Sequence, residues 1–148
     1  VCSSDLAIIR RQQSVNGPAL PWRDRTLFAQ RMFEHDIEAH DRSRLADGVV
    51  FHDRGLPDVI GYLTLCGLQV PDHMSEAART LRYHPTVFIA PLWPEIFGQD
   101  AERRQDFNEA KRTYEAMAMV YPRYGYRLVE MPKATVAERV AFVLDQIV

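Results

Sequence analysis

Short apolar runs alternate with helical segments along most of this chain, and this order strongly limits the folds that it can adopt. The runs at residues 49–52, 86–90 and 126–131 are rich in β-branched and aromatic residues, which is typical of buried strands. Segments with a helical spacing of apolar side chains separate and follow them. The alternation predicts an α/β fold with a parallel sheet and right-handed crossovers.

Capping residues and chain breakers indicate where the helices begin. Asp24 is expected to cap a helix over residues 25–44, and Thr135 with Glu138 has the pattern of a capping box before the last helix. The other predicted helices cover residues 7–15, 58–65, 75–81 and 99–124. The side chains expected on the buried face of the last helix are Val136, Val140, Val143, Leu144 and Ile147.

Bulk properties argue against several classes of protein. The 148 residues fit one domain, and a formal net charge of −2 provides no basic field for sequence-independent nucleic-acid binding. No apolar run approaches the roughly 20 residues that a membrane-spanning helix needs. Cys2 and Cys66 do not build a disulfide framework, and no zinc-binding spacing occurs. We therefore expect a cytoplasmic protein without a nucleic-acid partner or a membrane span.

The first six residues, VCSSDL, have no helical or strand periodicity and do not resemble a signal peptide. They can be encoded by the end of a common sequencing-library adapter. We interpret residues 1–6 as a non-native scar and residues 7–148 as a single partial domain. The alternative is a native, disordered N-terminus.

The segment VVFHDRGLPD, residues 49–58, carries the main candidate site. Loops that follow the strands of open α/β sheets hold ligands, and Asp53 and Arg54 stand where such a loop begins. Asp53 could bind Mg²⁺ through water or act as a general base, and its alternative role is a helix cap. Arg54 could clamp a phosphate, or form a structural ion pair with Asp58. Asp58 itself is expected to cap its own helix.

A second charged cluster, DAERRQD at residues 100–106, follows the second predicted strand. Arg103 and Arg104 could close over phosphates as a lid and stabilise negative charge. A solvated helix face with alternating charges is the simpler alternative, and the residue types alone favour it.

In addition, several segments of the chain resemble segments of a known protein family. They are QQSVNGPALPWRDRTLFAQRMFEHDI, VVFHDRGLPDVIGYL, RYHPTVFIAPLWPEIF, QDAERRQDFNEAKRTYEAM and YGYRLVEMPKATVAERVAFVL. In this order they resemble the NadR-like AAA-domain family of P-loop ATPases and predicted kinases, over nearly the whole chain from Ala7. The resemblance implies a Rossmann-like P-loop NTPase fold and the binding of ATP with Mg²⁺.

The resemblance also implies roles for individual residues. Asp53 and Arg54 match an Asp-Arg pair in which the acid serves Mg²⁺ or the substrate hydroxyl, and the arginine serves phosphate or orients the acid. Arg103 and Arg104 match the lid-like segment. The loop placed where relatives hold the nucleotide base consists of Pro132, Lys133 and Ala134.

One motif of the family is not found in the 148 residues. This motif, Gly-x-x-x-x-Gly-Lys-[Ser/Thr], supplies backbone N–H groups and a lysine to the phosphates. The strand before it normally lies between the strands at 49–52 and 86–90, and its loss would leave two unpaired strand edges. We therefore predict a P-loop NTPase fold that lacks its first strand and P-loop.

This prediction gives different activities to the printed chain and to the intact protein. We expect the intact form to be an ATPase or a small-molecule kinase, with a nucleotide and an unidentified acceptor as partners, and the fragment to be inactive. One alternative is a non-catalytic nucleotide- or lipid-binding regulatory module on the same fold. Another is an interaction domain in which DRGLPD is only a cap and a turn.

Overall fold

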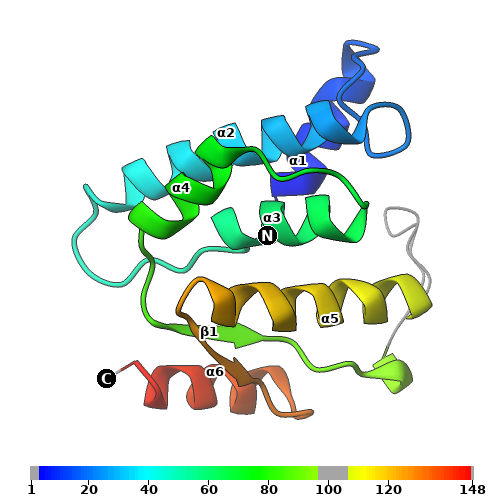
Figure 1. The fold of residues 1–148 in the computed structure, drawn as a ribbon. Coiled ribbons are helices and arrows are strands. Elements are labelled where there is room, and N and C mark those ends of the chain that lie inside the picture. Colours follow the sequence, from blue (N-terminus) through cyan, green and yellow to red (C-terminus); the bar gives the residue numbers. More distant parts are fainter. Residues whose placement is uncertain (1–3, 97–106, 148) are drawn as a thin grey trace. The chain divides into compact units, whose positions relative to one another are not determined.

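The computed structural model describes residues 4–96 and 107–147 (Figure 1). The chain divides into two compact units, Val1–Arg82 and Tyr83–Val148. Among the described residues, the first unit contains helices only, and the second combines helices with a small sheet.

Helices build the described part of the first unit, and α2 begins where its capping signal predicts. The Asp24 carboxylate accepts a hydrogen bond from Leu27 N at 2.8 Å, which confirms the predicted cap. Helices α2 and α3 pack together, with α1 against α2 and α4 against α3. Their bounds are α1 Ser4–Ser14, α2 Arg25–Ser43, α3 Leu56–Leu65 and α4 Asp72–Thr80. The largest fully buried side chains are Met32, Leu56, Leu63, Val59 and Pro57.

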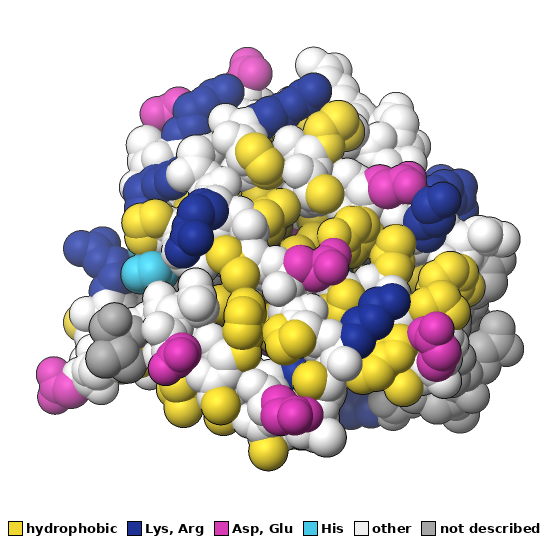
Figure 2. Space-filling model, turned by 90° about the horizontal axis from the view of Figure 1, so that it is seen from below, with side chains coloured by type: hydrophobic (Ala, Val, Ile, Leu, Met, Phe, Trp, Pro, Cys, Tyr) yellow, Lys and Arg dark blue, Asp and Glu magenta, His cyan; other side chains and the backbone are white. Residues whose placement is uncertain are grey.

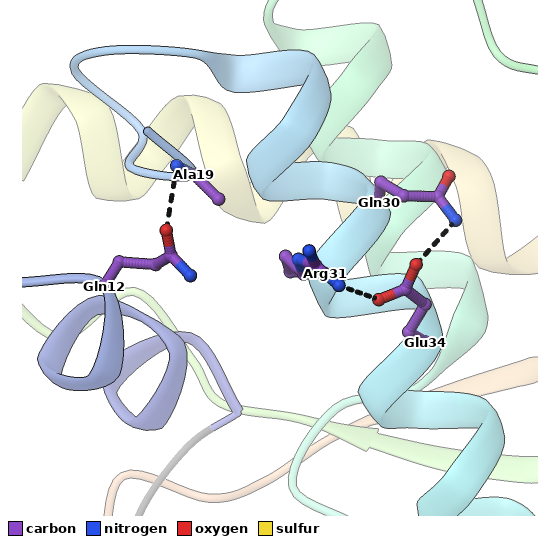
Figure 3. A network of polar contacts seen from close by, with 5 residues as sticks. All are labelled: Gln12, Ala19, Gln30, Arg31 and Glu34. Carbon is purple, nitrogen blue, oxygen red and sulfur yellow. Dashed lines mark hydrogen bonds and ion pairs between the residues drawn. The ribbon is translucent and has the colours of Figure 1, made fainter. Parts of the chain in front are cut away.

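The connection from α1 to α2 is held by one side chain of α1. Gln12 Oε1 accepts a hydrogen bond from Ala19 N at 3.1 Å (Figure 3). Gly17 N also donates to Gln12 O at 2.7 Å. A Cβ atom at Gly17 would lie 2.0 Å from Gln12 Oε1, so a larger residue here would push this side chain away and cost its hydrogen bond to Ala19 N.

Residues 49–52 are not a strand, so this prediction is wrong. The segment is irregular, and Val49, Val50 and Phe51 are exposed, Val49 to 69%. A strand needs a neighbour to pair its N–H and C=O groups, and the described part of the first unit contains no other strand. β-branched and aromatic composition alone therefore does not produce a strand at this position.

The second unit contains a two-stranded parallel sheet, as the alternation of elements predicts (Figure 1). Strands β1 (Thr86–Ile89) and β2 (Arg127–Glu130) pair in the register Thr86↔Arg127 to Ile89↔Glu130. The connection between them contains the short 3-10 turn η1 (Pro94–Ile96) and helix α5 (Phe107–Arg123), and α6 (Val136–Asp145) follows β2. The predicted helix start at residue 99 lies outside the described residues.

The two faces of this sheet pack against different helices. Val87 and Ile89 pack toward a buried cluster to which α5 contributes. Phe88 points to the other face, because side chains alternate along a strand, and its ring meets Phe142 of α6 at 6.4 Å between centroids. The members of the buried cluster are Met117, Tyr121 and Tyr126.

Helix α6 begins as predicted but does not bury the predicted face. Thr135 N donates to Glu138 Oε2 at 2.9 Å, and Glu138 N donates to Thr135 Oγ1 at 3.4 Å, which confirms the capping box. Among the residues expected inside, three are exposed, namely Val136, Val140 and Leu144. Hydrophobic side chains are visible at the surface when the molecule is seen from below (Figure 2). The face that packs on β1 carries Phe142 instead.

Candidate functional site

The loop that enters α3 has an unusual backbone at Arg54. Its φ is +76°, in the left-handed region that residues other than glycine rarely adopt, and this costs about 1–2 kcal/mol. Asp53 and Arg54 both have exposed side chains at this bend. Non-glycine residues in this region cluster at functional sites, where the surrounding structure holds them. The bend is thus the strongest structural feature of the predicted site.

A capping interaction fixes the helix directly after the bend. Gly55 is the N-cap residue of α3, and its N–H donates to Asp58 Oδ2 at 2.9 Å. The predicted role of Asp58 as a cap of its own helix is confirmed. The alternative that Asp53 caps this helix is wrong, because Gly55 occupies the N-cap position. The Asp53 carboxylate is therefore not used as the N-cap.

Arg54 forms an ion pair with the N-terminal helix. Its Nη1 atom lies 3.3 Å from Oδ2 of Asp5 in α1. Asp58, the partner that the sequence suggested, lies at the start of α3 and bonds Gly55 N. The guanidinium of Arg54 thus already binds a carboxylate.

Asp36 of α2 is a further charged residue of this region, and sequence reasoning missed it. Its side chain is only 7% exposed, and Nδ1 of His35 lies 3.6 Å from its Oδ1. Burial, and to a smaller extent the negative charges of Asp58, Asp5 and Asp53, raise the pKa of Asp36 to about 7. The positive charge of Arg54 opposes this rise in pKa. Asp36 is thus electrostatically linked to the bend.

A sequence signal for Asp36 exists in its spacing. Met32, Asp36 and His40 are four residues apart, and all three are buried on one face of α2. A carboxylate within an apolar stripe is unusual, because an unpaired buried charge is costly. Such a position marks a polar group that has partners or a function.

The described residues suit Mg²⁺ only if the ion is held through few protein ligands and keeps several waters. Among the described residues, no group of three or more His, Cys, Asp or Glu side chains could hold a metal ion. Mg²⁺ often keeps several waters and binds through one or two carboxylates plus substrate phosphates. The exposed carboxylate of Asp53 fits that arrangement, in which it would contact the ion through water.

The other predicted site residues lie apart from the bend in the sequence. Arg103 and Arg104 fall outside the described residues. The loop after β2 belongs to the second unit, and it turns tightly because Ala134 N donates to Pro132 O at 3.0 Å. Lys133 is exposed at the tip of this turn.

A hollow of about 380 Å³ lies in the first unit, lined by residues 21–26 and Leu68. It contains none of the predicted site residues, so it does not coincide with the site that the sequence suggests. Volumes of ligand pockets begin near this size.

Comparison with models of known protein families shows to which family the chain belongs. A family model described as an AAA domain matches residues 6–139. The chain belongs to the AAA domain family. The match includes Asp53, Arg54 and the loop at 132–134 in this AAA domain. No curated protein matches it, and no solved structure matches it.

Family membership indicates a nucleotide-binding function of the P-loop NTPase type for this AAA domain. Its helix-rich α/β structure with a two-stranded parallel sheet is compatible with a P-loop-like fold. In the part of the chain that the structure describes, the helices are too short or too polar to cross a membrane.

Proposed function

We propose that the intact protein is a P-loop NTPase that binds ATP with Mg²⁺ and either hydrolyses it or transfers its γ-phosphate to a small molecule. The observation that carries this proposal is the match to the AAA domain over residues 6–139. The finer assignment to the NadR-like group rests on the resemblance of the segments around Asp53 and Arg54. ATP, Mg²⁺ and a small acceptor are the partners that the proposal requires.

Asp53 and Arg54 supply the chemistry in this proposal. The exposed Asp53 carboxylate can hold a water of Mg²⁺ or accept the proton of the acceptor hydroxyl. The Arg54 guanidinium already pairs with a carboxylate in the structure, and a phosphate is the chemically similar ligand. Mg²⁺, when bound, neutralises charge on the phosphates. The left-handed backbone at Arg54 supports a functional origin of this bend.

The proposal assigns the phosphate-binding loop to sequence encoded upstream of Ala7. The printed chain contains no Gly-x-x-x-x-Gly-Lys-[Ser/Thr] motif, which other P-loop proteins use to hold the β- and γ-phosphates. The run at residues 49–52 supports this assignment, since its apolar side chains Val49, Val50 and Phe51 are exposed and the described part of the first unit contains no strand to pair with it. Reading the genomic coding sequence ahead of residue 7 tests it directly: a strand and a P-loop are expected, and a start codon with neither would refute it.

Measuring the turnover of ATP by the full-length gene product tests the catalytic part of the proposal. We expect phosphate release or transfer with Mg²⁺ and ATP on a panel of nucleosides and small alcohols. Asp53→Asn should abolish turnover and leave the circular dichroism spectrum unchanged, whereas Asp47→Asn, an exposed acid in the preceding turn, should behave as the wild type. Unchanged turnover in Asp53→Asn would remove Asp53 from the site. Nucleotide binding without any turnover would instead indicate a regulatory module.

A further inference from the structure

The hollow at the start of α2 combines an exposed indole ring with two arginines. It measures about 380 Å³ and lies wholly within the first unit, between residues 21–26 and Leu68. Trp22 is 47% exposed, although large aromatic side chains are mostly buried in folded proteins. Ligand pockets typically combine apolar and aromatic walls with a few well-placed polar groups. Trp22 and Leu68 supply such a wall here.

Hydrogen bonds to the loop before α2 hold both arginines in place. Arg23 Nη1 donates to Asn16 Oδ1 at 3.0 Å and to Gly17 O at 3.3 Å, and Arg25 Nε donates to Pro21 O at 3.3 Å. A guanidinium has five N–H donors, so each arginine keeps donors beyond those used in these bonds. A side chain that is already held loses less conformational freedom when it binds a ligand. The two guanidinium groups are therefore partly preorganised.

Positive charge exceeds negative charge among the residues that line the hollow. Asp24 is the acid among them, and its carboxylate already accepts the N–H of Leu27 as the cap of α2. Arg23 and Arg25 outnumber it. The first turn of α2 lines the same hollow and adds the positive end of the helix dipole. An anionic group is therefore favoured at this position.

We propose that the hollow binds a small molecule in which a flat aromatic ring carries a carboxylate or a phosphate. The ring stacks on Trp22, and the anionic group pairs with the guanidinium groups of Arg23 and Arg25. The bend at Arg54 precedes α3, whereas Leu68 follows it, and a ten-residue helix is about 15 Å long. The hollow is thus a second site, and the proposal does not depend on the proposed nucleotide-binding function.

Nuclear magnetic resonance of the ¹⁵N-labelled full-length gene product tests this proposal. The side-chain N–H signal of Trp22, identified by its loss in Trp22→Phe, reports on the hollow, and that of Trp93 in the second unit is the internal control. The probes are 2-naphthoate and 2-naphthyl phosphate, with 2-naphthamide lacking the charge and decalin-2-carboxylate lacking the flat ring. We expect a saturable shift of the Trp22 signal by one or both anionic naphthalenes at about 1 mM or below. The tighter of the two identifies the anionic group, and the two control probes should bind at least about tenfold more weakly.

One substitution separates the arginine contact from general surface charge. Arg25→Gln should weaken the binding of the anionic naphthalenes roughly ten- to hundredfold, the range for a hydrogen bond to a charged group, and leave that of 2-naphthamide unchanged. Arg42→Gln is the matched control, because it removes the same charge from an exposed position near the other end of α2. It should change no affinity.

Four results would overturn the proposal. The Trp22 signal could fail to shift saturably with either anionic naphthalene. Equal affinity for 2-naphthamide would reduce the hollow to an apolar contact. Equal losses in Arg25→Gln and Arg42→Gln would show that general surface charge attracts the anions. Equal shifts of the Trp22 and Trp93 signals would mean that the probes bind without selecting the hollow.

Discussion

The buried carboxyl of Asp36 allows a quantitative test of the electrostatics around the bend at Arg54. Its pKa of about 7 in the folded protein compares with an ordinary value of 3.8. Because the folded state holds the proton more tightly, the unfolded state loses it first as the pH rises. Stability therefore falls between pH 4 and pH 7, and above pH 7 the ionised, buried Asp36 costs about 4 kcal/mol.

Asp36→Asn removes this titration and keeps the shape of the side chain. Relative to the wild type, this substitution should raise the free energy of unfolding by about 3 kcal/mol more at pH 8 than at pH 5. Glu38→Gln is the matched control, because Glu38 is an exposed carboxylate on the same helix, and its effect should differ little between the two pH values.

Urea unfolding followed by tryptophan emission measures this difference. Trp22 lies in the first unit and Trp93 in the second, so a Trp93→Phe background makes emission report on the unit that contains Asp36. Titrations at pH 5, 6, 7 and 8 give the free energy of unfolding at each pH. A gain that does not change with pH would mean that Asp36 does not titrate in this range, and the electrostatic reasoning would then be refuted.

Three substitutions test other features of the structure. Arg54→Gly should be about 1 kcal/mol more stable than Arg54→Ala in urea unfolding, because both lose the ion pair with Asp5 but only glycine relieves the left-handed backbone; equal stabilities would contradict the strain. Thr135→Ala should destabilise the second unit by about 1 kcal/mol, seen in Trp93 emission, since α6 loses its capping box with Glu138; no change would show that the cap is dispensable. Leu63→Ala should cost about 3 kcal/mol in the first unit, because this side chain is fully buried, and a loss below 1 kcal/mol would contradict its place in the core.

Features with a local cause could be predicted from the sequence. The caps at Asp24, Asp58 and Thr135 depend on one side chain and the first helical turn, so residue type and spacing suffice to find them. The parallel pairing of β1 with β2 also follows from the order of elements alone.

Features that depend on distant parts of the chain could not be predicted in this way. The run at residues 49–52 has strand composition but no neighbour, and the face of α6 that carries Val136 has no cover among the described residues. Apolar spacing shows which residues share a face, but not whether another element packs there. Asp36 was missed for a related reason: its spacing places it on an apolar face of α2, but its burial and its charged neighbours appear only in the folded structure.

Binding of MgATP by the full-length gene product tests the central claim most directly. Isothermal titration should show saturable binding at one site per chain, with an affinity that falls when Mg²⁺ is removed by a chelator. Asp53→Asn should retain the fold and reduce this dependence on Mg²⁺. The absence of any binding heat at millimolar MgATP, for a protein with an intact circular dichroism spectrum, would contradict the account.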